Sequence, residues 1–478
     1  MNRTYIKDLK NNVGKTVSIS AWVDVRRDHG KLIFIDLRDM SGRVQTVALP
    51  SNKEAHEIAS KVRSEWVVRA EGIVNKRPEK MISKNKETGE IEENGDIELE
   101  LKKLEVLNEA QTPPIDVRSD GTEIGEEARL KHRYLDLRRP RVQKNIRTRH
   151  KIIKYVRDFL DNEGFTEIET PILTKSTPEG ARDYVVPSRL ENGRFYALPQ
   201  SPQQYKQLLM VAGFEKYFQI ARCFRDEDTR SDRQPEFTQM DLEMSFVERE
   251  EVMALNEKLL VEIVTKLYPN KKIQTVPFPR ISYKEAMEKY KSDRPDIRTD
   301  KNDPNLLAFC WVIDFPFFEK TDEDPLTGRS GWTFTHNPFS APKPEHMPML
   351  MNKEKIGDIL TTQYDVVLNG FEIGGGSIRN HAPEALKKVF EIMGYPDEQI
   401  ESNFGHMLRA LASGAPPHGG IAWGLDRFVT LLQNESSIRE VIAFAKTGEG
   451  KDLMMEAPSE ISEKQMRELG IELRKKKK

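Results

Sequence analysis

Residues 216–246, KYFQIARCFRDEDTRSDRQPEFTQMDLEMSF, decide the fold of most of this chain. Two runs of alternating residue character flank a loop in which arginines and acids are concentrated. Successive side chains of a strand point to opposite faces, so the second run has two distinct sides. One side carries Phe237, Gln239, Asp241 and Glu243, and the other carries Thr238, Met240, Leu242, Met244 and Phe246. The pattern predicts two strands joined by a charged loop, with one face in a hydrophobic core and the other forming a polar floor.

The loop at 224–237, FRDEDTRSDRQPEF, indicates a ligand site more strongly than the strands themselves do. Alternation alone is ordinary in a strand with one face in solvent. An isolated arginine is usually part of a surface ion pair. Arginines and acids clustered between two largely apolar strands suit a polyphosphate with its metal ion. The loop therefore predicts a polyphosphate-binding site.

The first part of the chain has the pattern of a small barrel. Short strands with period-2 alternation are predicted at residues 16–25, 32–37, 44–49, 66–74 and 97–107. A helical stretch at 53–63 falls between the third and the fourth strand. This order matches an OB-type barrel, a fold that binds oligonucleotides.

Prolines and glycines among polar residues mark a linker after the barrel. A strongly amphipathic helix is predicted next, at 142–162, with Gly164 placed to end it. We therefore expect an OB-fold domain at 1–110, a linker at 111–135 and a second domain at 136–478. The fold class is α+β.

The composition describes a folded protein with a heavily charged surface. Among its 478 residues, 37% are hydrophobic and 32% are charged, and the net charge is -2. Cys223 and Cys310 lie far apart in sequence, so neither a disulfide framework nor a zinc site is predicted. The sequence contains no run of about 18 apolar residues, so we expect a cytoplasmic protein without a membrane anchor.

Three motifs in order give the chain its family resemblance. They are FTEIETPIL at 165–173, the charged loop at 224–237, and GGIAWGLDRF at 419–428. With them the chain resembles the class II aminoacyl-tRNA synthetases. Further stretches resemble the bacterial aspartyl branch over nearly the whole chain: TPEGARDY at 177–184, QSPQQYKQ at 200–207 and NGFEIGGGSIR at 369–379.

The resemblance implies a homodimer whose catalytic domain is an antiparallel sheet flanked by helices. It implies that ATP activates L-aspartate to an adenylate, which is transferred to the 3′ end of tRNA(Asp), with tRNA(Asn) as a second candidate. Two alternatives stay open: asparaginyl-tRNA synthetase, and a paralogue that makes asparagine from aspartate. The barrel argues against the paralogue, and Arg379 in GGGSIR favours aspartate.

Attack on the α-phosphate builds negative charge that fixed cations must stabilise. The resemblance makes Arg225 the catalytic contact to that phosphate and places Phe237 and Arg427 on either side of the adenine. The implied ATP-binding set is Arg225, Asp226, Glu227, Arg233, Gln234, Phe237, Glu372, Gly424, Leu425, Asp426 and Arg427. The implied Mg²⁺ ligands are Asp365 and Glu372, an odd spacing that would point them to opposite faces of a straight strand. A bulge or turn at Asn369-Gly370 is therefore predicted.

Recognition of aspartate needs a second carboxylate-binding group, which a guanidinium and an ammonium supply. The resemblance gives this role to Arg379 and Lys206. The full implied set is Glu179, Gln203, Lys206, Arg225, Asp241, His336 and Arg379, with Glu179, Gln203 and Asp241 on the substrate's ammonium. For His336 the alternative is an ordinary loop histidine. The next residue, Asn337, stands where most bacterial relatives have a second histidine.

Unpaired anticodon bases stack on aromatic side chains of OB barrels. The resemblance implies that Phe34 stacks, that Gln45 and Glu98 contact bases, and that His29 and Lys80 influence tRNA discrimination. Phe34 could instead belong to the barrel core. Arg26, Arg27 and Lys31 are expected phosphate contacts. The resemblance also shows a departure, because the extra domain that bacterial relatives carry before the third motif is missing here.

Overall fold

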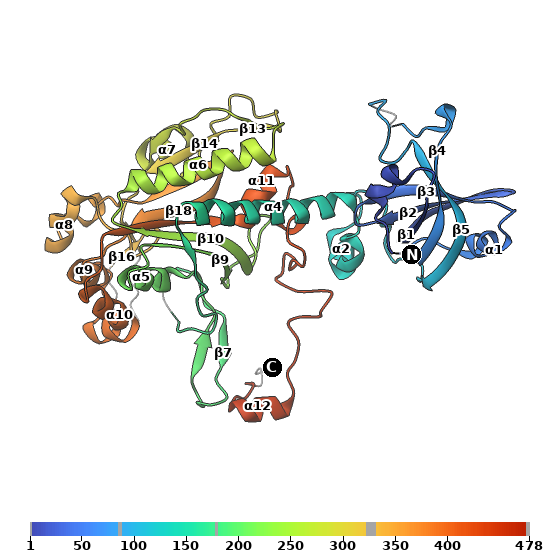
Figure 1. Cartoon of the computed structure of the whole chain (residues 1–478). Helices are drawn as coiled ribbons and strands as arrows, with labels where there is room; N and C mark the ends of the chain where they lie inside the picture. The colour runs from blue at the N-terminus through green and yellow to red at the C-terminus, as the bar shows by residue number, and fades with distance from the viewer. Residues whose placement is uncertain (1, 85–87, 177–179, 322–330, 475–478) are drawn as a thin grey trace. The chain divides into compact units, whose positions relative to one another are not determined.

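The computed structural model describes residues 2–84, 88–176, 180–321 and 331–474 (Figure 1). The chain divides into two compact units, residues 1–139 and 140–478. The expected linker at 111–135 thus belongs to the same compact unit as the barrel. Among the described residues, no helix has the length and apolarity needed to cross a membrane.

The predicted five-stranded OB barrel is confirmed in the first unit. Its strands are β1 (Thr16–His29), β2 (Leu32–Asp39), β3 (Gly42–Ala48), β4 (Val67–Lys76) and β5 (Ile97–Asn108), closed in the order β1-β2-β3-β5-β4. Helix α1 (Lys53–Lys61) lies between β3 and β4 along the chain, as the sequence predicts. In β2 the alternation places Ile33, Ile35 and Leu37 in the core, because every second side chain points inward. Short 3₁₀ helices are η1 (Ile6–Asn12) and η2 (Glu79–Met81).

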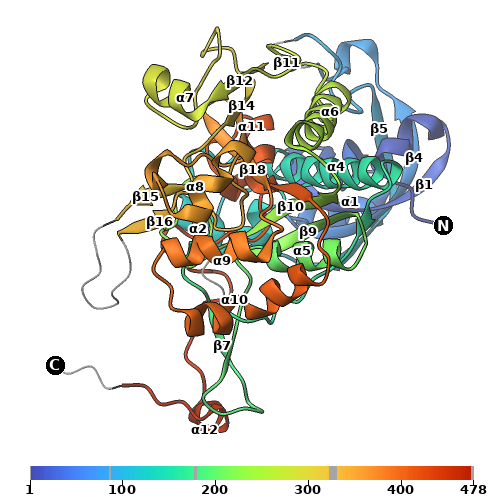
Figure 2. The same cartoon turned by 90° about the vertical axis from the view of Figure 1, so that its left-hand side faces the viewer.

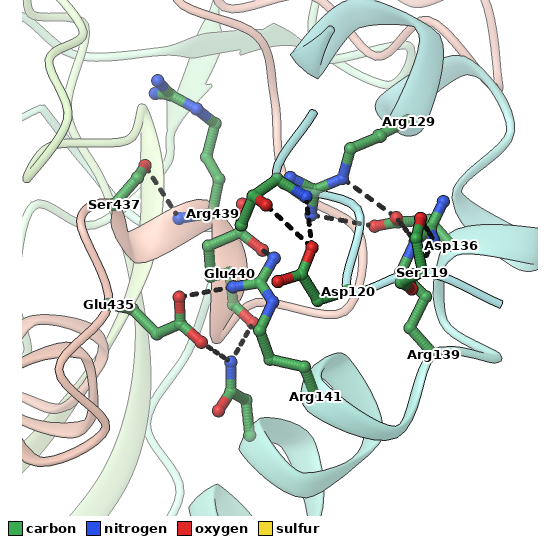
Figure 3. Close-up of polar contacts among 12 residues, drawn as sticks. Ser119, Asp120, Arg129, Asp136, Arg139, Arg141, Glu435, Ser437, Arg439 and Glu440 are labelled. Atoms are coloured by element: carbon green, nitrogen blue, oxygen red, sulfur yellow. Dashed lines mark hydrogen bonds and ion pairs between the residues drawn. The ribbon is translucent and has the colours of Figure 1, made fainter. Parts of the chain in front are cut away.

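The segment after the barrel is folded around one buried carboxylate. Its helices are α2 (Glu126–Lys131) and α3 (Arg133–Asp136). Asp136 is fully buried and accepts hydrogen bonds from Arg129 at 2.9 Å and from Arg139 at 2.7 Å (Figure 3). Arg133 also pairs with Asp136. The charges of three arginines therefore converge on a single acid.

The second unit is built on an eight-stranded sheet in the order β12-β14-β17-β18-β19-β10-β9-β6. Its strands are β6 (Thr166–Glu167), β9 (Lys216–Phe224), β10 (Glu236–Ser245), β12 (Arg280–Ser282), β14 (Phe309–Ile313), β17 (Tyr364–Leu368), β18 (Phe371–Ile378) and β19 (His418–Gly424). From β14 to β9 all neighbours are antiparallel, as expected. The two edge pairings, β12 with β14 and β6 with β9, are parallel. The expected antiparallel sheet is therefore confirmed from β14 to β9, and the two parallel edge pairings, reached through longer connections, make the whole sheet mixed.

Helices cover both faces of this sheet (Figures 1 and 2). The helices of the second unit are α4 (Pro140–Asn162), α5 (Gln203–Val211), α6 (Arg249–Leu267), α7 (Tyr283–Tyr290), α8 (Met347–Asn352), α9 (Pro383–Ile392), α10 (Asp397–Ala412), α11 (Leu425–Leu432) and α12 (Glu463–Leu469), of which α12 lies away from the sheet. Apolar residues of α4, α6 and α11 share one core with Met240 and Leu242 of β10. The predicted helix at 142–162 is α4, and Gly164 follows it with a φ of 82° that favours glycine.

Shorter elements complete the second unit. They are the strands β7 (Val185–Pro187), β8 (Phe195–Ala197), β11 (Lys272–Ile273), β13 (Leu306–Leu307), β15 (Phe318–Lys320) and β16 (Trp332–Phe334), with the 3₁₀ helices η3 (Pro344–His346), η4 (Ile356–Asp358) and η5 (Ile438–Glu440). The start of α4 is tied to the segment after α11. Arg141 forms ion pairs with Glu435 and Glu440, which Figure 3 shows.

Candidate active site

The polar face of β10 forms the floor of the site, as its alternation predicts. Asp241 and Glu243 are buried there, 1% and 0% exposed, opposite the core face that carries Met240 and Leu242. The neighbouring strand β19 places Gly420 beside Glu243. A Cβ at Gly420 would lie 2.1 Å from Glu243 Oε2, so only glycine leaves room for this carboxylate.

Two cations neutralise these two acids inside the protein. Lys206 Nζ, on α5, lies 2.7 Å from Asp241 Oδ1 and 3.2 Å from Glu243 Oε2. Arg379 donates to both oxygens of Glu243, from Nε at 2.8 Å and from Nη2 at 3.1 Å. Lys206 and Arg379 are 1% and 2% exposed. The structure therefore brings both expected readers of the aspartate side chain into one buried cluster of two positive and two negative groups.

The surrounding charges set the protonation of the two acids. Burial alone raises the pKa of Glu243, but Arg379 and Lys206 lower it to about 2. Burial raises the pKa of Asp241 against the opposing charge of Lys206. Asp241 Oδ2 is buried without a hydrogen-bond partner. Asp241 is therefore the acid of this cluster with an acceptor left over, which fits its expected contact to a substrate ammonium.

Arg379 offers a substrate only part of its guanidinium. Its Nε and Nη2 edge is held by Glu243, and Nη2 also lies 3.3 Å from the Gly420 carbonyl oxygen. Nη1 donates to Ser377 Oγ at 2.9 Å. Among the residues that the structure describes, no carboxylate contacts Nη1.

Arg225 and Phe237 lie together on the nucleotide side. The Arg225 guanidinium carbon is 5.2 Å from the centre of the Phe237 ring. Arg427 binds Asp232 at 3.1 Å and the Glu372 carbonyl oxygen, and its Nε is buried without a hydrogen-bond partner. Arg225 thus directly follows β9, and Arg427 lies against the start of β18.

Other residues expected at the nucleotide have different surroundings. Arg233 is exposed and pairs with Glu227 at 3.4 Å. The side-chain oxygen of Gln234 accepts a hydrogen bond from the Lys446 backbone at 2.8 Å. Asp226 pairs its backbone with Arg182. Arg233 and Glu227 are therefore accessible to a ligand, whereas the Gln234 oxygen already has a partner in the protein.

The third motif spans the end of β19 and the start of α11. Gly424 ends the strand, and Leu425 begins the helix. Asp426 is buried and accepts a hydrogen bond from the Thr238 backbone at 2.9 Å, while its other oxygen pairs with Arg149. The Asp426 carboxylate therefore fixes α11 to β10 and α4.

The expected Mg²⁺ ligands converge, and a turn and a bulge explain how. Asn369 and Gly370 both have positive φ, 52° and 86°, and form the turn between β17 and β18. The register of the two strands shifts between Val366 and Val367. A Cβ at Gly375 would lie 2.8 Å from Asp365 Oδ1 and 3.4 Å from Glu372 Oε1. The two carboxylates therefore lie on one face, as a shared cation requires.

The carboxylate pair has the chemistry of a hard-cation site. Burial and the neighbouring Glu372 raise the pKa of Asp365 well above its usual range. A divalent cation would relieve this repulsion, and oxygen ligands are those Mg²⁺ prefers. Within the described parts of the chain, no group of three or more His, Cys, Asp or Glu side chains could hold a metal. The residues thus fit a cation that takes its remaining ligands from water and phosphate.

His336 and its neighbour lie in the loop after β16. His336 packs edge-on against Phe315, with ring centres 4.7 Å apart. Burial lowers its pKa, against the charges of Glu372, Asp293 and Glu319, so the ring is neutral at physiological pH. Asn337 caps the following turn, since its Oδ1 accepts from the Phe339 backbone at 3.0 Å. Glu179, expected at the substrate ammonium, lies outside the described residues.

Four of the expected tRNA-contacting residues form two contacting pairs, His29 with Phe34 and Gln45 with Glu98. Phe34 is partly exposed and lies outside the barrel core, so the alternative core assignment is not supported. His29 packs edge-on against it at 5.6 Å. Gln45 donates to Glu98 at 3.3 Å and accepts from Arg27 at 3.2 Å. Lys80 is exposed in η2.

Arg27 differs from its expected role as a phosphate contact. It binds Asp36 with two hydrogen bonds, at 2.7 and 2.8 Å, as well as Gln45. Its side chain therefore orients the Gln45 amide. Arg26 and Lys31 are exposed and remain available to a phosphate backbone.

Sequence reasoning missed residues that hold the expected ones in place. Glu243 shares the face of Asp241, and this parity could have identified it as a site residue. Ser377, Gln207 and His418 carry no comparable signal, because their role depends on contacts between distant segments. Gln203, expected at the substrate, donates to Gln207 at 3.0 Å.

Comparison with known families covers both units. A model described as "tRNA synthetases class II (D, K and N)" matches residues 125–448, and one described as "OB-fold nucleic acid binding domain" matches residues 17–107. The Aspartate--tRNA(Asp/Asn) ligase of Natranaerobius thermophilus is 41% identical, with 97% of this chain and 98% of that protein covered. The Aspartate--tRNA ligase of Staphylococcus carnosus is 39% identical, with 97% of each chain covered.

These relatives are longer than this chain. The Aspartate--tRNA(Asp/Asn) ligase of Desulfatibacillum aliphaticivorans is 39% identical over a span of 591 residues, with 98% of this chain and 96% of that protein covered. This chain has 478 residues. The relative therefore contains residues without a counterpart here, which agrees with the missing extra domain.

Two solved structures show the same fold. One is an asparaginyl-tRNA synthetase from Pyrococcus horikoshii, with a TM-score of 0.73, 23% identity and coverage of 94% of this chain and 98% of that one. The other is an aspartyl tRNA synthetase from Entamoeba histolytica, with a TM-score of 0.71, 23% identity and coverage of 93% and 91%. At this identity the likeness concerns the fold alone.

Proposed function

The chain belongs to the class II tRNA synthetases of the aspartate, lysine and asparagine group, and we propose that it is an aspartate–tRNA ligase. It uses ATP to activate L-aspartate as aspartyl-adenylate and transfers the aspartyl group to the 3′ end of tRNA(Asp). The relatives that share about two fifths of its residues support this assignment. Asparaginyl-tRNA synthesis is the less favoured alternative.

The single observation that carries the proposal is the buried pair of cations on the strand floor. Lys206 and Arg379 lie within one charge cluster, and both are almost fully buried. A substrate side-chain carboxylate can accept hydrogen bonds with both of its oxygens from these two cations, whereas the amide of asparagine has one acceptor oxygen and an NH2 group whose hydrogens would oppose those of the donors. The geometry therefore favours aspartate over asparagine.

The proposed first step joins the aspartate α-carboxylate to the α-phosphorus of ATP and releases pyrophosphate. Arg225 stabilises the charge that develops on the α-phosphate, and Arg427 and Arg233 hold the outer phosphates. Asp365 and Glu372 would hold Mg²⁺, which when bound neutralises phosphate charge. Asp241 and Gln203 orient the substrate ammonium, so that the α-carboxylate faces the nucleotide.

The tRNA is proposed to lie across the barrel surface that carries Phe34, Gln45 and Glu98. Bases can stack on the exposed ring, at about 1 to 3 kcal/mol for each base. We further propose a cytoplasmic homodimer. The segment 165–173 supports dimerisation, because it exposes Ile172 and Leu173 at 40% and 53%.

Amino-acid-dependent pyrophosphate exchange tests the proposal directly. We expect exchange with aspartate to exceed exchange with asparagine by about 10⁴-fold, because a polar mismatch in a buried site gives discrimination of this order. Exchange that requires asparagine would assign the chain to the asparaginyl enzymes. Exchange with neither amino acid would exclude a synthetase activity.

Charging of purified tRNA(Asp) and tRNA(Asn) side by side defines the tRNA partner. His29 and Lys80 point in opposite directions for the second tRNA, but relatives named Aspartate--tRNA(Asp/Asn) ligase support it, and we expect aspartylation of both tRNAs at rates within about tenfold, or 1.4 kcal/mol. An unrelated tRNA serves as the control. Charging of tRNA(Asp) alone would restrict the enzyme to one tRNA and remove the discriminating role of His29.

A further inference from the structure

We propose that Gln207 and His418 are positioning residues for aspartate binding, because they fix which atom of the Gln203 side-chain amide faces the substrate. The inference rests on the proposed function and deepens it. A chain of hydrogen bonds runs from the Pro416 carbonyl through His418 and Gln207 to Gln203. The direction of each hydrogen bond in this chain fixes the direction of the next one.

The chain begins at an atom that can only accept. His418 Nδ1 lies 2.7 Å from the Pro416 carbonyl oxygen, so Nδ1 carries a hydrogen and donates it. In a neutral imidazole the other nitrogen, Nε2, is then an acceptor. It lies 3.1 Å from the Gln207 side-chain nitrogen. His418 and Gln207 are both 0% exposed, so no solvent competes for these contacts.

The direction of the hydrogen bond at Gln207 then fixes that at Gln203, one turn earlier in α5. Gln207 donates its amide nitrogen to His418, so its oxygen faces the preceding turn and accepts from Gln203 Nε2 at 3.0 Å. Gln203 must therefore donate inward. Its side-chain oxygen is left for the substrate side, where Gln203 is partly exposed. An oxygen is the atom that an ammonium group requires.

A proton on His418 Nε2 would reverse the direction of the hydrogen bonds from His418 through Gln207 to Gln203. An imidazolium donates from both nitrogens, so Gln207 would turn its oxygen toward His418 and its nitrogen toward Gln203. The Gln203 nitrogen would then face the substrate ammonium and oppose it. The charged and titratable groups that face His418 are Glu243, Arg379 and His381.

The surroundings of His418 favour the neutral ring. Burial lowers its pKa; Glu243 opposes this effect, while Arg379 and His381 add to it. The folded pKa is therefore below the usual 6.5, and the binding-competent direction is present at neutral pH. It is lost as the pH falls through that lowered value.

A matched pair on the same helix supplies the control. Gln204, the residue after Gln203, accepts a hydrogen bond from His406 Nε2 with its side-chain oxygen at 2.6 Å and is 7% exposed. It has the same residue types as the proposed pair, and Gln204 is buried like Gln207, whereas His406 is exposed. Neither Gln204 nor His406 has a hydrogen bond to Gln203. Gln204→Leu therefore reproduces the packing change without touching the chain.

The test compares Gln207→Leu, Gln207→Glu and Gln204→Leu in aspartate-dependent pyrophosphate exchange at neutral pH. Gln207→Leu removes the acceptor for Gln203, and we expect the aspartate KM to rise about tenfold while the ATP KM and kcat stay within about threefold. In Gln207→Glu the carboxylate accepts from both Gln203 and a protonated His418, so we expect an aspartate KM within about threefold of the wild type. Gln204→Leu should match the wild type.

The pH profile separates positioning from packing. In the wild type and in Gln204→Leu the aspartate KM should rise as the pH falls through the lowered pKa of His418. In Gln207→Glu the aspartate KM should not rise in acid. The carboxylate accepts a hydrogen bond from the Gln203 nitrogen whether His418 is neutral or protonated. If Gln207→Leu does not fold, the pH profiles of the wild type, Gln204→Leu and Gln207→Glu still test the proposal.

Three results would overturn the proposal. They are an unchanged aspartate KM in Gln207→Leu, an aspartate KM in Gln207→Glu that is higher than in Gln207→Leu, and equal rises in the KM of aspartate and of ATP. A wild-type enzyme that shows no exchange with aspartate would instead contradict the proposed function, so the two failures are distinguishable.

Discussion

Replacement of Arg379 by leucine is expected to abolish aspartate activation, with a loss of about 10³- to 10⁵-fold in kcat/KM for aspartate. The substrate's side-chain carboxylate would lose a charged, buried partner and keep only Lys206. The loss should appear in aspartate-dependent pyrophosphate exchange. The ATP KM should change little, because the contacts of Arg379 lie on the floor beneath the amino acid, at Glu243, Ser377 and Gly420.

The same substitution should also lower stability, since Arg379 is the main partner of Glu243. Removal of one member of a buried ion pair costs about 3 to 5 kcal/mol. Lys206 still lies 3.2 Å from Glu243 and offsets part of this cost. The double variant Arg379→Leu, Glu243→Gln removes both charges and should recover much of the stability without recovering activity.

Urea unfolding and pyrophosphate exchange on the single and double variants separate these effects. Lys154→Leu, on the exposed face of α4, is a control because its pair with Asp158 is solvent-exposed and contributes about 0 to 1 kcal/mol. Normal aspartate activation by Arg379→Leu would refute the role of this arginine. Recovery of activity in the double variant would show that the single variant had failed through folding alone.

Periodicity predicted those elements whose faces differ in polarity. β2 illustrates this, because Ile33, Ile35 and Leu37 enter the barrel core while Phe34 stays outside it. β10 follows the same rule, with Met240 and Leu242 in the core opposite Asp241 and Glu243. A strand with one buried face strongly specifies its register, so the sequence pattern alone was sufficient.

The edges of the large sheet could not be predicted in this way. β6 and β12 have two and three residues, which is too short for a period to appear. Their parallel pairing is set by crossovers of many residues. The fold of the segment after the barrel could not be predicted either, because it depends on contacts of Arg129, Arg133 and Arg139 with Asp136.

In the candidate site, too, some features were predicted from the sequence and others were not. The resemblance supplied Lys206, Arg379 and the pair Asp365 and Glu372, and the structure brings each set together. The direction of a hydrogen bond at Gln203 was not accessible, because it is set by His418, more than two hundred residues later in the sequence. The contacts of the Asp426 carboxylate with Thr238 and Arg149 were likewise not accessible, because they join segments far apart in the sequence.

Asp136→Ala is expected to destabilise the first unit by about 3 to 5 kcal/mol, because it leaves buried arginine charge without its counter-ion. Asp136 is 0% exposed, as is Arg139, and Arg133 is 2% exposed. Urea unfolding of the whole chain measures the loss. Asp158→Ala, which removes an exposed acid paired with Lys154, should change the free energy of unfolding by less than about 1 kcal/mol.

The pH dependence of Asp136→Asn distinguishes charge from packing at this position. Burial alone raises the pKa of Asp136, but hydrogen bonds from Arg129 and Arg139 and the charge of Arg133 bring it below the usual 3.8. A lowered folded pKa means that the carboxylate contributes its full stability above pH 3.8 and loses it as the pH falls through the folded value. The difference in unfolding free energy between wild type and Asp136→Asn should therefore be constant from pH 5 to pH 7 and shrink below about pH 4. A difference that stays unchanged into acid would mean that the side chain acts through its shape, and the three arginines would then need another source of neutralisation.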